Sequence, residues 1–255
     1  MNVLGRVAAT LALLAMTTSG SPPIGPGAGR PSAPRAQAGG VASTSQRTSA
    51  SSSRPTVRLL FVGASVTAGY GADNPDHAFP ELVASHLRAA GWNTVVHIAA
   101  RPGATTAEAA KWGLSGAADA VVVHLVTNDF SRGTPLATYQ ADYGDVIRRL
   151  RVSSPSAKLV CLGGWGSPAS VNRAGISAER YNDIARTVCT ANRGTFVNVS
   201  ALYLQKADHG PAGGMTSNGL TDYFHPNDRG HRQLAAAVLR ELAIPAGASG
   251  RRATV

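Results

Sequence analysis

The sequence is 255 residues long and carries a formal net charge of +10 at pH 7. Residues 1–55 hold five arginines and no acidic residue, so residues 56–255 hold nineteen basic and fourteen acidic side chains. The length allows one domain of ordinary size. A small basic surplus spread along that domain excludes the dense basic face typical of nucleic-acid-binding proteins, and we expect no nucleic-acid partner.

The first 20 residues have the features of a secretory signal peptide. Arg6 precedes an uncharged apolar core, residues 7–16, and small residues suited to signal peptidase follow it. This core is too short to span a bilayer. We therefore expect a secreted protein with no stable membrane insertion after signal removal. The alternative is retention by an uncleaved amino-terminal anchor.

The segment after the signal is rich in Pro, Gly, Ala and Ser and has almost nothing to bury. Such a chain cannot offset the entropy lost on ordering. We expect a disordered linker over residues 21–55, one folded domain over residues 56–244 and a flexible basic tail over residues 245–255.

Within the folded part, strand-like and helix-like patterns alternate. Apolar runs typical of buried strands cover residues 57–62, 93–99, 119–126, 158–162 and 195–199. Helical spacing covers residues 79–90, 105–112, 139–150, 177–191 and 227–242. This alternation predicts a five-stranded parallel sheet covered by helices on both faces. Two irregular stretches, 163–175 and 205–224, are expected at the carboxyl edge of that sheet.

Ser65 lies just past the first strand, in the turn that begins at Gly63. Ligands of open parallel sheets bind at the carboxyl edge, so a nucleophile is well placed there. Taken alone, the segment fits a strand followed by a Gly/Ser turn equally well. The distant partners of Ser65 decide between these interpretations.

Asp222-Tyr-Phe-His225-Pro226 is the second candidate element. A serine hydroxyl needs an imidazole to take its proton, and the imidazole needs a carboxylate to orient it. A carboxylate three residues before a histidine can reach its ring on one tight turn. The alternative is a helix-capping Asp222 and a surface His225. His209 and His231 are rival bases, but His209 is adjacent to Asp208 and His231 falls inside the last predicted helix.

Two further residues follow strands at the same edge. The side chain of Asn128 and the backbone N–H of Gly103 could both point at a developing oxyanion. Each could also be an ordinary turn residue. Their shared location with Ser65 and His225 favours the catalytic interpretation.

These elements together resemble the SGNH hydrolases, also called GDSL-type esterases and lipases. The four blocks of that family correspond to Gly63-Ala64-Ser65, the glycine at Gly103, Val126-Thr127-Asn128-Asp129, and Asp222 to Pro226. The sequence departs from the family pattern in two places. Ala64 stands where the family usually has Asp, and Val126 stands where it usually has Gly.

The resemblance implies a flavodoxin-like three-layer α/β/α sandwich with no metal and no organic cofactor. It also implies ester hydrolysis through an acyl-enzyme. Ser65, His225 and Asp222 would form the catalytic triad, and Ser65, Gly103 and Asn128 would form the oxyanion hole.

Cys161 and Cys189 are the two cysteines of the chain. In an exported protein they are expected to form a disulfide, with two buried free thiols as the alternative.

The predicted edge loops indicate the substrate class. The chain has no lid-length insertion and few aromatic residues, and residues 163–167 and 213–219 are Gly-rich and polar. This favours a shallow cleft for acetyl to butyryl esters of small molecules or polysaccharides. Trp165 could stack on a sugar ring, cover a short acyl chain or pack against its own loop.

Three other functions are alternatives to a short-chain esterase. One is a lipase for longer acyl chains, and another is a non-catalytic carbohydrate- or wall-binding descendant of the fold. The third is a nucleotide- or flavin-binding module, but the turn after the first strand lacks a phosphate-cradling glycine fingerprint. We expect a monomer that takes a small-molecule or polysaccharide ester.

Overall fold

The computed structural model of the protein describes residues 54–210 and 222–245. The predicted signal peptide, nearly all of the predicted linker and the tail beyond residue 245 lie outside these ranges. The same holds for the Gly-rich wall predicted over residues 213–219. The domain boundaries proposed from the sequence therefore stay predictions.

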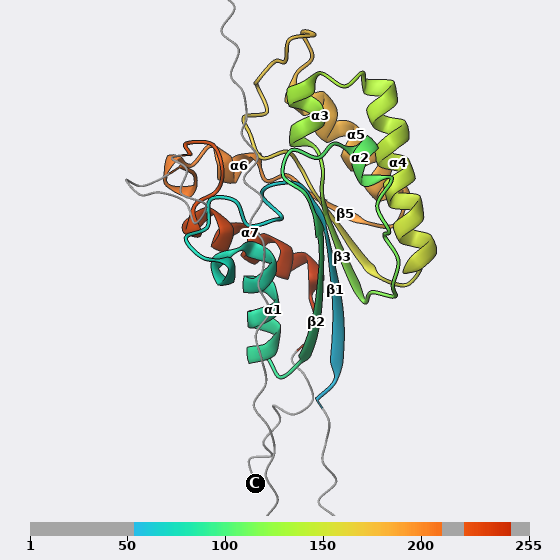
Figure 1. The fold of residues 1–255 in the computed structure, drawn as a ribbon, viewed down its shortest axis with the longest axis vertical. Helices are drawn as coiled ribbons and strands as arrows, with labels where there is room; N and C mark the ends of the chain where they lie inside the picture. Colours follow the sequence, from blue (N-terminus) through green and yellow to red (C-terminus); the bar gives the residue numbers. More distant parts are fainter. Residues whose placement is uncertain (1–53, 211–221, 246–255) are drawn as a thin grey trace, which may run out of the picture. The chain divides into compact units, whose positions relative to one another are not determined.

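Five parallel strands form one sheet in the order β2-β1-β3-β4-β5 (Figure 1). The strands are β1 (Thr56–Gly63), β2 (Asn93–Ala100), β3 (Ala120–His124), β4 (Lys158–Leu162) and β5 (Thr195–Val197). In the register of the three neighbouring strands, Gly63 pairs with Ala100 on one side and with His124 on the other. The segments that follow β1, β2 and β3 therefore begin at the same edge of the sheet.

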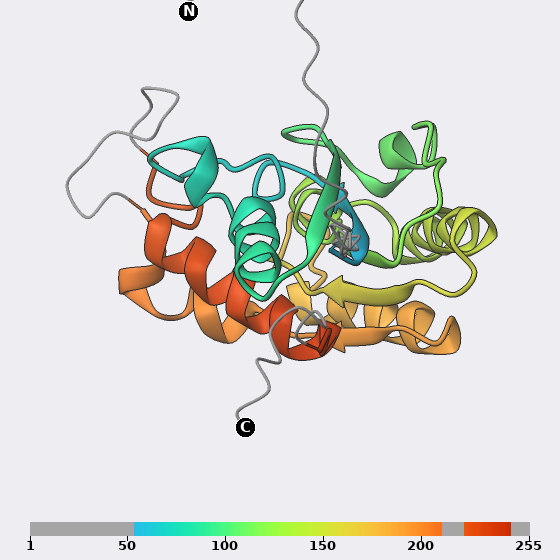
Figure 2. The ribbon, with the colours of Figure 1, turned by 90° about the horizontal axis from the view of Figure 1, so that it is seen from below.

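Helices cover both faces of the sheet, which confirms the predicted three-layer α/β/α sandwich. One face carries α1 (Phe79–Ala89) and α7 (Asp228–Leu242), and the other carries α4 (Leu136–Ser153), α5 (Ala178–Ala191) and the short α2 (Thr106–Ala109), as Figures 1 and 2 show. Within the ranges 54–210 and 222–245, no helix combines the length and apolarity needed to cross a bilayer.

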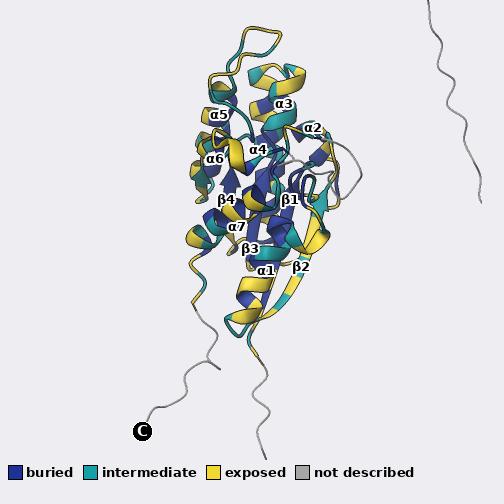
Figure 3. Cartoon of the chain, turned by 90° about the vertical axis from the view of Figure 1, so that its left-hand side faces the viewer, coloured by how far each residue is buried: buried dark blue, intermediate teal, exposed yellow. Residues whose placement is uncertain are grey.

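The core consists of two apolar clusters, one on each face of the sheet. Alternate residues of β1 enter different clusters, because side chains of a strand point to opposite faces. Leu60 and Val62 pack on the α4 and α5 side, whereas Leu59 and Phe61 pack on the α1 and α7 side. The strand is apolar on both faces for this reason. Figure 3 shows β1 and β3 buried and the edge strand β2 partly exposed.

The structure differs from the sequence prediction after the third strand. Residues 119–126 were expected to be one strand, but β3 ends at His124 and a short helix, α3 (Thr127–Arg132), follows. The backbone of Val126 is already helical, with φ −100° and ψ −45°. The apolar side chains of Leu125 and Val126 are buried in the core, although these residues do not continue the strand.

Three more short helical segments lie where the sequence analysis predicts no helix. They are η1 (Pro75–His77), α6 (Ser200–Tyr203) and η2 (Lys206–Asp208). Segments of three or four residues are too short to show a helical period in the sequence.

The predicted disulfide between Cys161 and Cys189 is confirmed. It joins β4 to α5 across a sequence separation of 28 residues, and both cysteines are fully buried. The bridge therefore links the sheet to one of its covering helices inside the core.

Removing this bridge is expected to destabilise the protein. Closing a loop of this length restricts the unfolded chain, which corresponds to about 3 kcal/mol of stability. The double variant Cys161→Ala/Cys189→Ala should lower the free energy of unfolding by about that amount in urea titrations. Non-reducing peptide mapping of the native protein provides the control. Two freely alkylated thiols in the native protein, or an unchanged unfolding midpoint in the variant, would contradict the prediction.

Candidate active site

Ser65 lies in a tight turn immediately after β1. The Ala68 N–H donates to Ala64 O at 2.9 Å, and the Tyr70 N–H donates to Ser65 O at 3.0 Å. Gly71 ends this turn with φ +88°, and a Cβ placed there would lie 2.1 Å from Pro226 O. A residue without a side chain is therefore needed for the turn to approach the segment that carries His225.

The side chains of Ser65, His225 and Asp222 form a chain of hydrogen bonds. His225 Nε2 lies 2.8 Å from Ser65 Oγ, and His225 Nδ1 contacts Asp222 Oδ2. The other carboxylate oxygen, Asp222 Oδ1, accepts from the N–H groups of Phe224 at 2.7 Å and of His225 at 3.1 Å. The sequence-predicted residues thus meet as expected, and the spacing of three residues lets one carboxylate bind both the ring and the backbone of its turn.

These hydrogen bonds determine the charge of Asp222. Burial raises the pKa of Asp222, but the N–H groups of Phe224 and His225 and the imidazole together hold it below its ordinary value. The carboxylate is therefore ionised at neutral pH. An ionised carboxylate at Nδ1 leaves Nε2 free to accept a proton from Ser65.

Aromatic side chains flank the imidazole of His225. The ring centroids of Tyr70 and Phe224 lie 5.4 Å and 5.3 Å from that of His225. The indole N–H of Trp165 donates to Phe224 O at 2.7 Å, one residue before the histidine. Trp165 is only 1% exposed. A ring with no open face does not suit the sugar-stacking role considered for it, and its contact instead supports the turn that carries His225.

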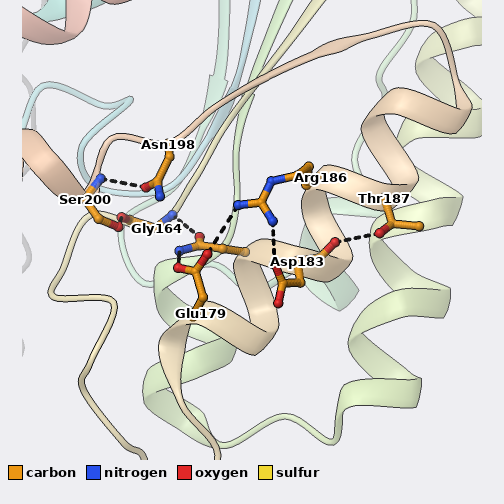
Figure 4. A network of polar contacts seen from close by, with 8 residues as sticks. Gly164, Glu179, Asp183, Arg186, Thr187, Asn198 and Ser200 are labelled. Carbon is orange, nitrogen blue, oxygen red and sulfur yellow. Dashed lines mark hydrogen bonds and ion pairs between the residues drawn. The ribbon is translucent and has the colours of Figure 1, made fainter.

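A polar network fixes the loop that carries Trp165 (Figure 4). The Gly164 N–H donates to Asn182 Oδ1 at 2.9 Å, and Asn182 Nδ2 donates to Glu179 Oε2 at 3.2 Å. Arg186 in turn pairs with Glu179 at 3.2 Å. Asn182 is buried, so these hydrogen bonds also satisfy its amide. Sequence reasoning missed Asn182, because it lies in mid-helix without any motif around it.

Gly103 and Asn128 both line the cavity that contains Ser65 and His225. Gly103 has φ +78°, a left-handed conformation that favours glycine. Asn128 Nδ2 donates to Ala104 O at 2.9 Å. An amide nitrogen carries two hydrogens, so Asn128 retains a second N–H for a substrate oxygen.

Helix α3 holds the segment after β2 at three of its residues, Gly103, Ala104 and Thr106. Besides the bond from Asn128, Arg132 Nη2 donates to Gly103 O at 2.7 Å. Asp129 accepts from the Thr106 N–H at 2.9 Å and from Thr106 Oγ1 at 3.0 Å. These contacts hold Gly103 and Asn128 at a set separation. Asp129 belongs to the sequence block that identified Asn128, but only the structure shows which loop it binds.

The cavity around Ser65 has a volume of about 300 Å³. Its lining includes a second histidine, His124, which sequence reasoning missed. Burial lowers the pKa of His124 to about 4, so this ring is neutral at physiological pH. Across the described part of the chain, no three His, Cys, Asp or Glu side chains gather in a group that could hold a metal ion.

The two rival bases lie in unsuitable surroundings. His231 is buried, with Nδ1 accepting from the Phe79 N–H at 3.2 Å and Nε2 2.9 Å from Tyr70 O. Burial also lowers its pKa to about 4. The ring of His209 stacks on that of Tyr203, with centroids 4.6 Å apart. Neither ring contacts Ser65, whereas His225 does.

The two departures from the family pattern are accommodated by packing. Ala64 is buried and lines the cavity beside Ser65. Val126 is buried against the loop after β4, where a Cβ on Gly164 would lie 3.2 Å from Val126 Cγ1. The absence of a side chain at Gly164 leaves room for valine. Neither change removes a group from the hydrogen-bonded chain of Ser65, His225 and Asp222.

Comparison with protein families and with solved structures places this geometry among known proteins. The model of the GDSL-like Lipase/Acylhydrolase family matches residues 61–233, which is more than half of the chain. A search of curated proteins finds no match.

Several solved structures share the fold. A possible lipase from Chitinophaga pinensis has a TM-score of 0.55 and 18% identity, with coverage of 73% of this chain and 99% of the other. The psychrotrophic esterase EstA from a Pseudoalteromonas species has a TM-score of 0.53 and 15% identity, covering 73% and 96%. A two-domain esterase active on acetylated mannans has a TM-score of 0.55 and 20% identity, covering 74% and 49%. At these identities the likeness establishes the fold.

Proposed function

The chain belongs to the GDSL-like lipase/acylhydrolase family and is a carboxylic ester hydrolase, and we propose that it is a secreted serine esterase for short acyl chains. The observation that carries this proposal is the contact of Ser65 Oγ with His225 Nε2 at 2.8 Å, with Asp222 on the other ring nitrogen. The region matched by the family model, residues 61–233, contains Ser65, Asp222 and His225.

In the proposed mechanism, Ser65 Oγ forms a bond to the acyl carbon while its proton passes to His225 Nε2. The carbonyl electrons move to oxygen, which accepts hydrogen bonds from the backbone N–H groups of Ser65 and Gly103 and from Asn128 Nδ2. The bond from carbon to the alcohol oxygen then breaks, and the alcohol leaves with the proton from His225. Water repeats these steps on the acyl-enzyme and releases the acid.

The proposed preference for short acyl chains is supported by a second, smaller cavity. Its volume is about 70 Å³, and it shares Thr127, Ser131 and Phe224 with the cavity around Ser65. Trp165 is among the residues that line it. The volume is far below the roughly 300–1,000 Å³ of sites for drug-sized ligands. Long acyl chains would find no enclosed path in this direction.

Two further observations support the wider proposal. The fold is shared with a two-domain esterase active on acetylated mannans, which makes acetylated carbohydrate a suitable first class of natural substrate to test. Secretion is supported by the signal-like residues 1–20 and by the disulfide, because structural disulfides persist in oxidising compartments.

The expected result with a series of 4-nitrophenyl esters from two to sixteen carbons is a maximum of kcat/KM at two to four carbons. Each buried methylene contributes up to about 0.8 kcal/mol, so the gain ends where the small cavity is filled. The Ser65→Ala variant provides the blank for spontaneous hydrolysis. A maximum at twelve carbons or more would favour a lipase instead. Absence of hydrolysis of every ester would favour a non-catalytic carbohydrate-binding protein.

A further inference from the structure

We propose that a basic cavity beside the catalytic cavity binds an anionic group, a carboxylate or a phosphate, on the alcohol part of the ester substrate. We call this cavity the basic subsite, and its defining side chains are Arg101, Lys111, Arg132, Glu108 and Trp112. The proposal rests on the esterase function proposed above, and it names the substrate class of that site.

The basic subsite adjoins the catalytic cavity directly. It has a volume of about 410 Å³, and Pro102 and Gly103 line both cavities. The wall between them is therefore this short segment, which also carries the proposed oxyanion donor at Gly103. An alcohol part of two or more units, such as an oligosaccharide, could extend from Ser65 over Pro102 into the basic subsite. A small neutral ester would leave it empty.

Positive charge dominates the basic subsite, because its single carboxylate is already engaged. Glu108 accepts from the Thr105 N–H at 2.7 Å and lies 3.8 Å from Arg132 Nη1. The Thr105 N–H also lowers the pKa of Glu108, so the carboxylate is ionised. Arg101 and Lys111 form no ion pair with any residue in the ranges 54–210 and 222–245. These two cations remain available to a ligand.

Two of the cations are held in place before any ligand binds. The guanidinium of Arg101 lies over the ring of Trp112, 5.4 Å from its centroid. Trp112 is 8% exposed, and its carbonyl accepts from Arg149 Nη2 at 2.9 Å. Arg132 is anchored by the bond to Gly103 O. Charged side chains that are already oriented lose less conformational entropy on binding an anion. Guanidinium groups also match the geometry of carboxylates and phosphates.

The lining of the catalytic cavity adds no negatively charged side chain beside the basic subsite, in the part that the structure describes. None of the described residues that line it is Asp or Glu. No carboxylate side chain therefore lines the described path between Ser65 and Gly103, where the basic subsite begins. The charge pattern favours acidic over neutral substrates of the same size.

The test compares acetyl esters in pairs, one anionic and one neutral. Acetylated oligogalacturonate is measured against its methyl-esterified form, and monoacetylglycerol phosphate is measured against monoacetylglycerol. Exposed ion pairs contribute modestly, so we expect kcat/KM to favour the anionic member of a pair by roughly tenfold at low salt. Screening by salt should reduce this ratio in about 0.5 M NaCl. The pair with the larger ratio identifies the anionic group as a carboxylate or a phosphate.

Matched variants assign the effect to the basic subsite. In the double variant Arg101→Gln/Lys111→Gln, the ratio of kcat/KM for anionic and neutral esters should fall to about one. The control Lys158→Gln/Arg240→Gln also removes one lysine and one arginine charge, but away from the basic subsite. Lys158 begins β4 at the opposite edge of the sheet, and Arg240 lies in the last turn of α7. This control should retain the ratio. Circular dichroism and thermal unfolding verify that both variants fold.

The outcomes separate this inference from the proposed function. Hydrolysis of both members of each pair with equal kcat/KM would overturn the basic subsite and leave the esterase intact. A ratio that persists in Arg101→Gln/Lys111→Gln would also overturn it. If no ester is hydrolysed, calorimetric titration of the Ser65→Ala variant with oligogalacturonate and with glycerol phosphate still tests the subsite. Binding that weakens in the added Arg101→Gln/Lys111→Gln background supports it, and absence of binding contradicts it.

Discussion

The Ser65→Ala variant is expected to lose at least about a thousandfold in kcat on 4-nitrophenyl acetate while remaining folded. Without Ser65 Oγ, the proton acceptor 2.8 Å away at His225 Nε2 has no hydroxyl to activate. Residues of a triad act as a unit, so the remaining His225 and Asp222 cannot restore the rate. Steady-state kinetics measures the loss, and thermal unfolding verifies the fold.

A matched control for this prediction is Ser153→Ala. Ser153 ends α4 just before β4 begins, at the edge of the sheet opposite Ser65, and its hydroxyl donates to Leu150 O at 3.2 Å. A fluorophosphonate should label native protein and the Ser153→Ala variant at the peptide that contains Ser65, and should not label Ser65→Ala. A folded Ser65→Ala protein with near-normal kcat would overturn the assignment of the nucleophile.

The Asn128→Ala variant is expected to lose on the order of a hundredfold or more in kcat, with little change in KM. The amide of Asn128 lines the catalytic cavity, and one of its two hydrogens is already bound to Ala104 O. In the proposed mechanism the remaining N–H donates to the charge that develops on the substrate oxygen. Such a donor stabilises the transition state more than the bound ester, so its loss lowers kcat.

The same substitution also removes the hydrogen bond to Ala104, and this structural effect must be separated from the catalytic one. Loss of that bond corresponds to about 1 kcal/mol in the free energy of unfolding, which urea titration measures independently. Asn93→Ala is the matched control, because Asn93 begins β2 at the opposite edge of the sheet and bonds to Thr56. If Asn128→Ala raises KM and leaves kcat unchanged, Asn128 binds substrate and is not an oxyanion donor.

The sheet was readily predicted because each strand is a short, bounded apolar run. Residues 158–162 coincide with β4, and the expected strand over residues 57–62 lies within β1. Buried parallel strands are apolar on both faces, which makes their sequence signal strong. The prediction was wrong at residues 125–126, where burial and not strand structure explains the apolar side chains. Helix α3 spans too few residues to show a helical period of its own.

The candidate site was predictable where its contacts are local. Asp222 and His225 are three residues apart, so the carboxylate can bind the ring and the backbone of one turn without help from the rest of the chain. Ser65 and His225 are 160 residues apart in sequence. Their meeting could be expected only because parallel topology brings the ends of all strands to one edge, and the resemblance to a family with the same blocks supported it.

By itself the sequence determined the order of strands and helices, the residue types available for chemistry and the local turn at Asp222 to Pro226. Periodicity and short spacing carry this information, because they depend only on neighbouring residues. The tertiary structure alone decided that Trp165 supports Phe224 and that Arg132 and Asp129 hold the loop at Gly103 and Thr106. It also brought Arg101 onto Trp112. These contacts join segments that are distant along the chain, and which side chains meet depends on how helices and loops pack on the sheet, which no local pattern records.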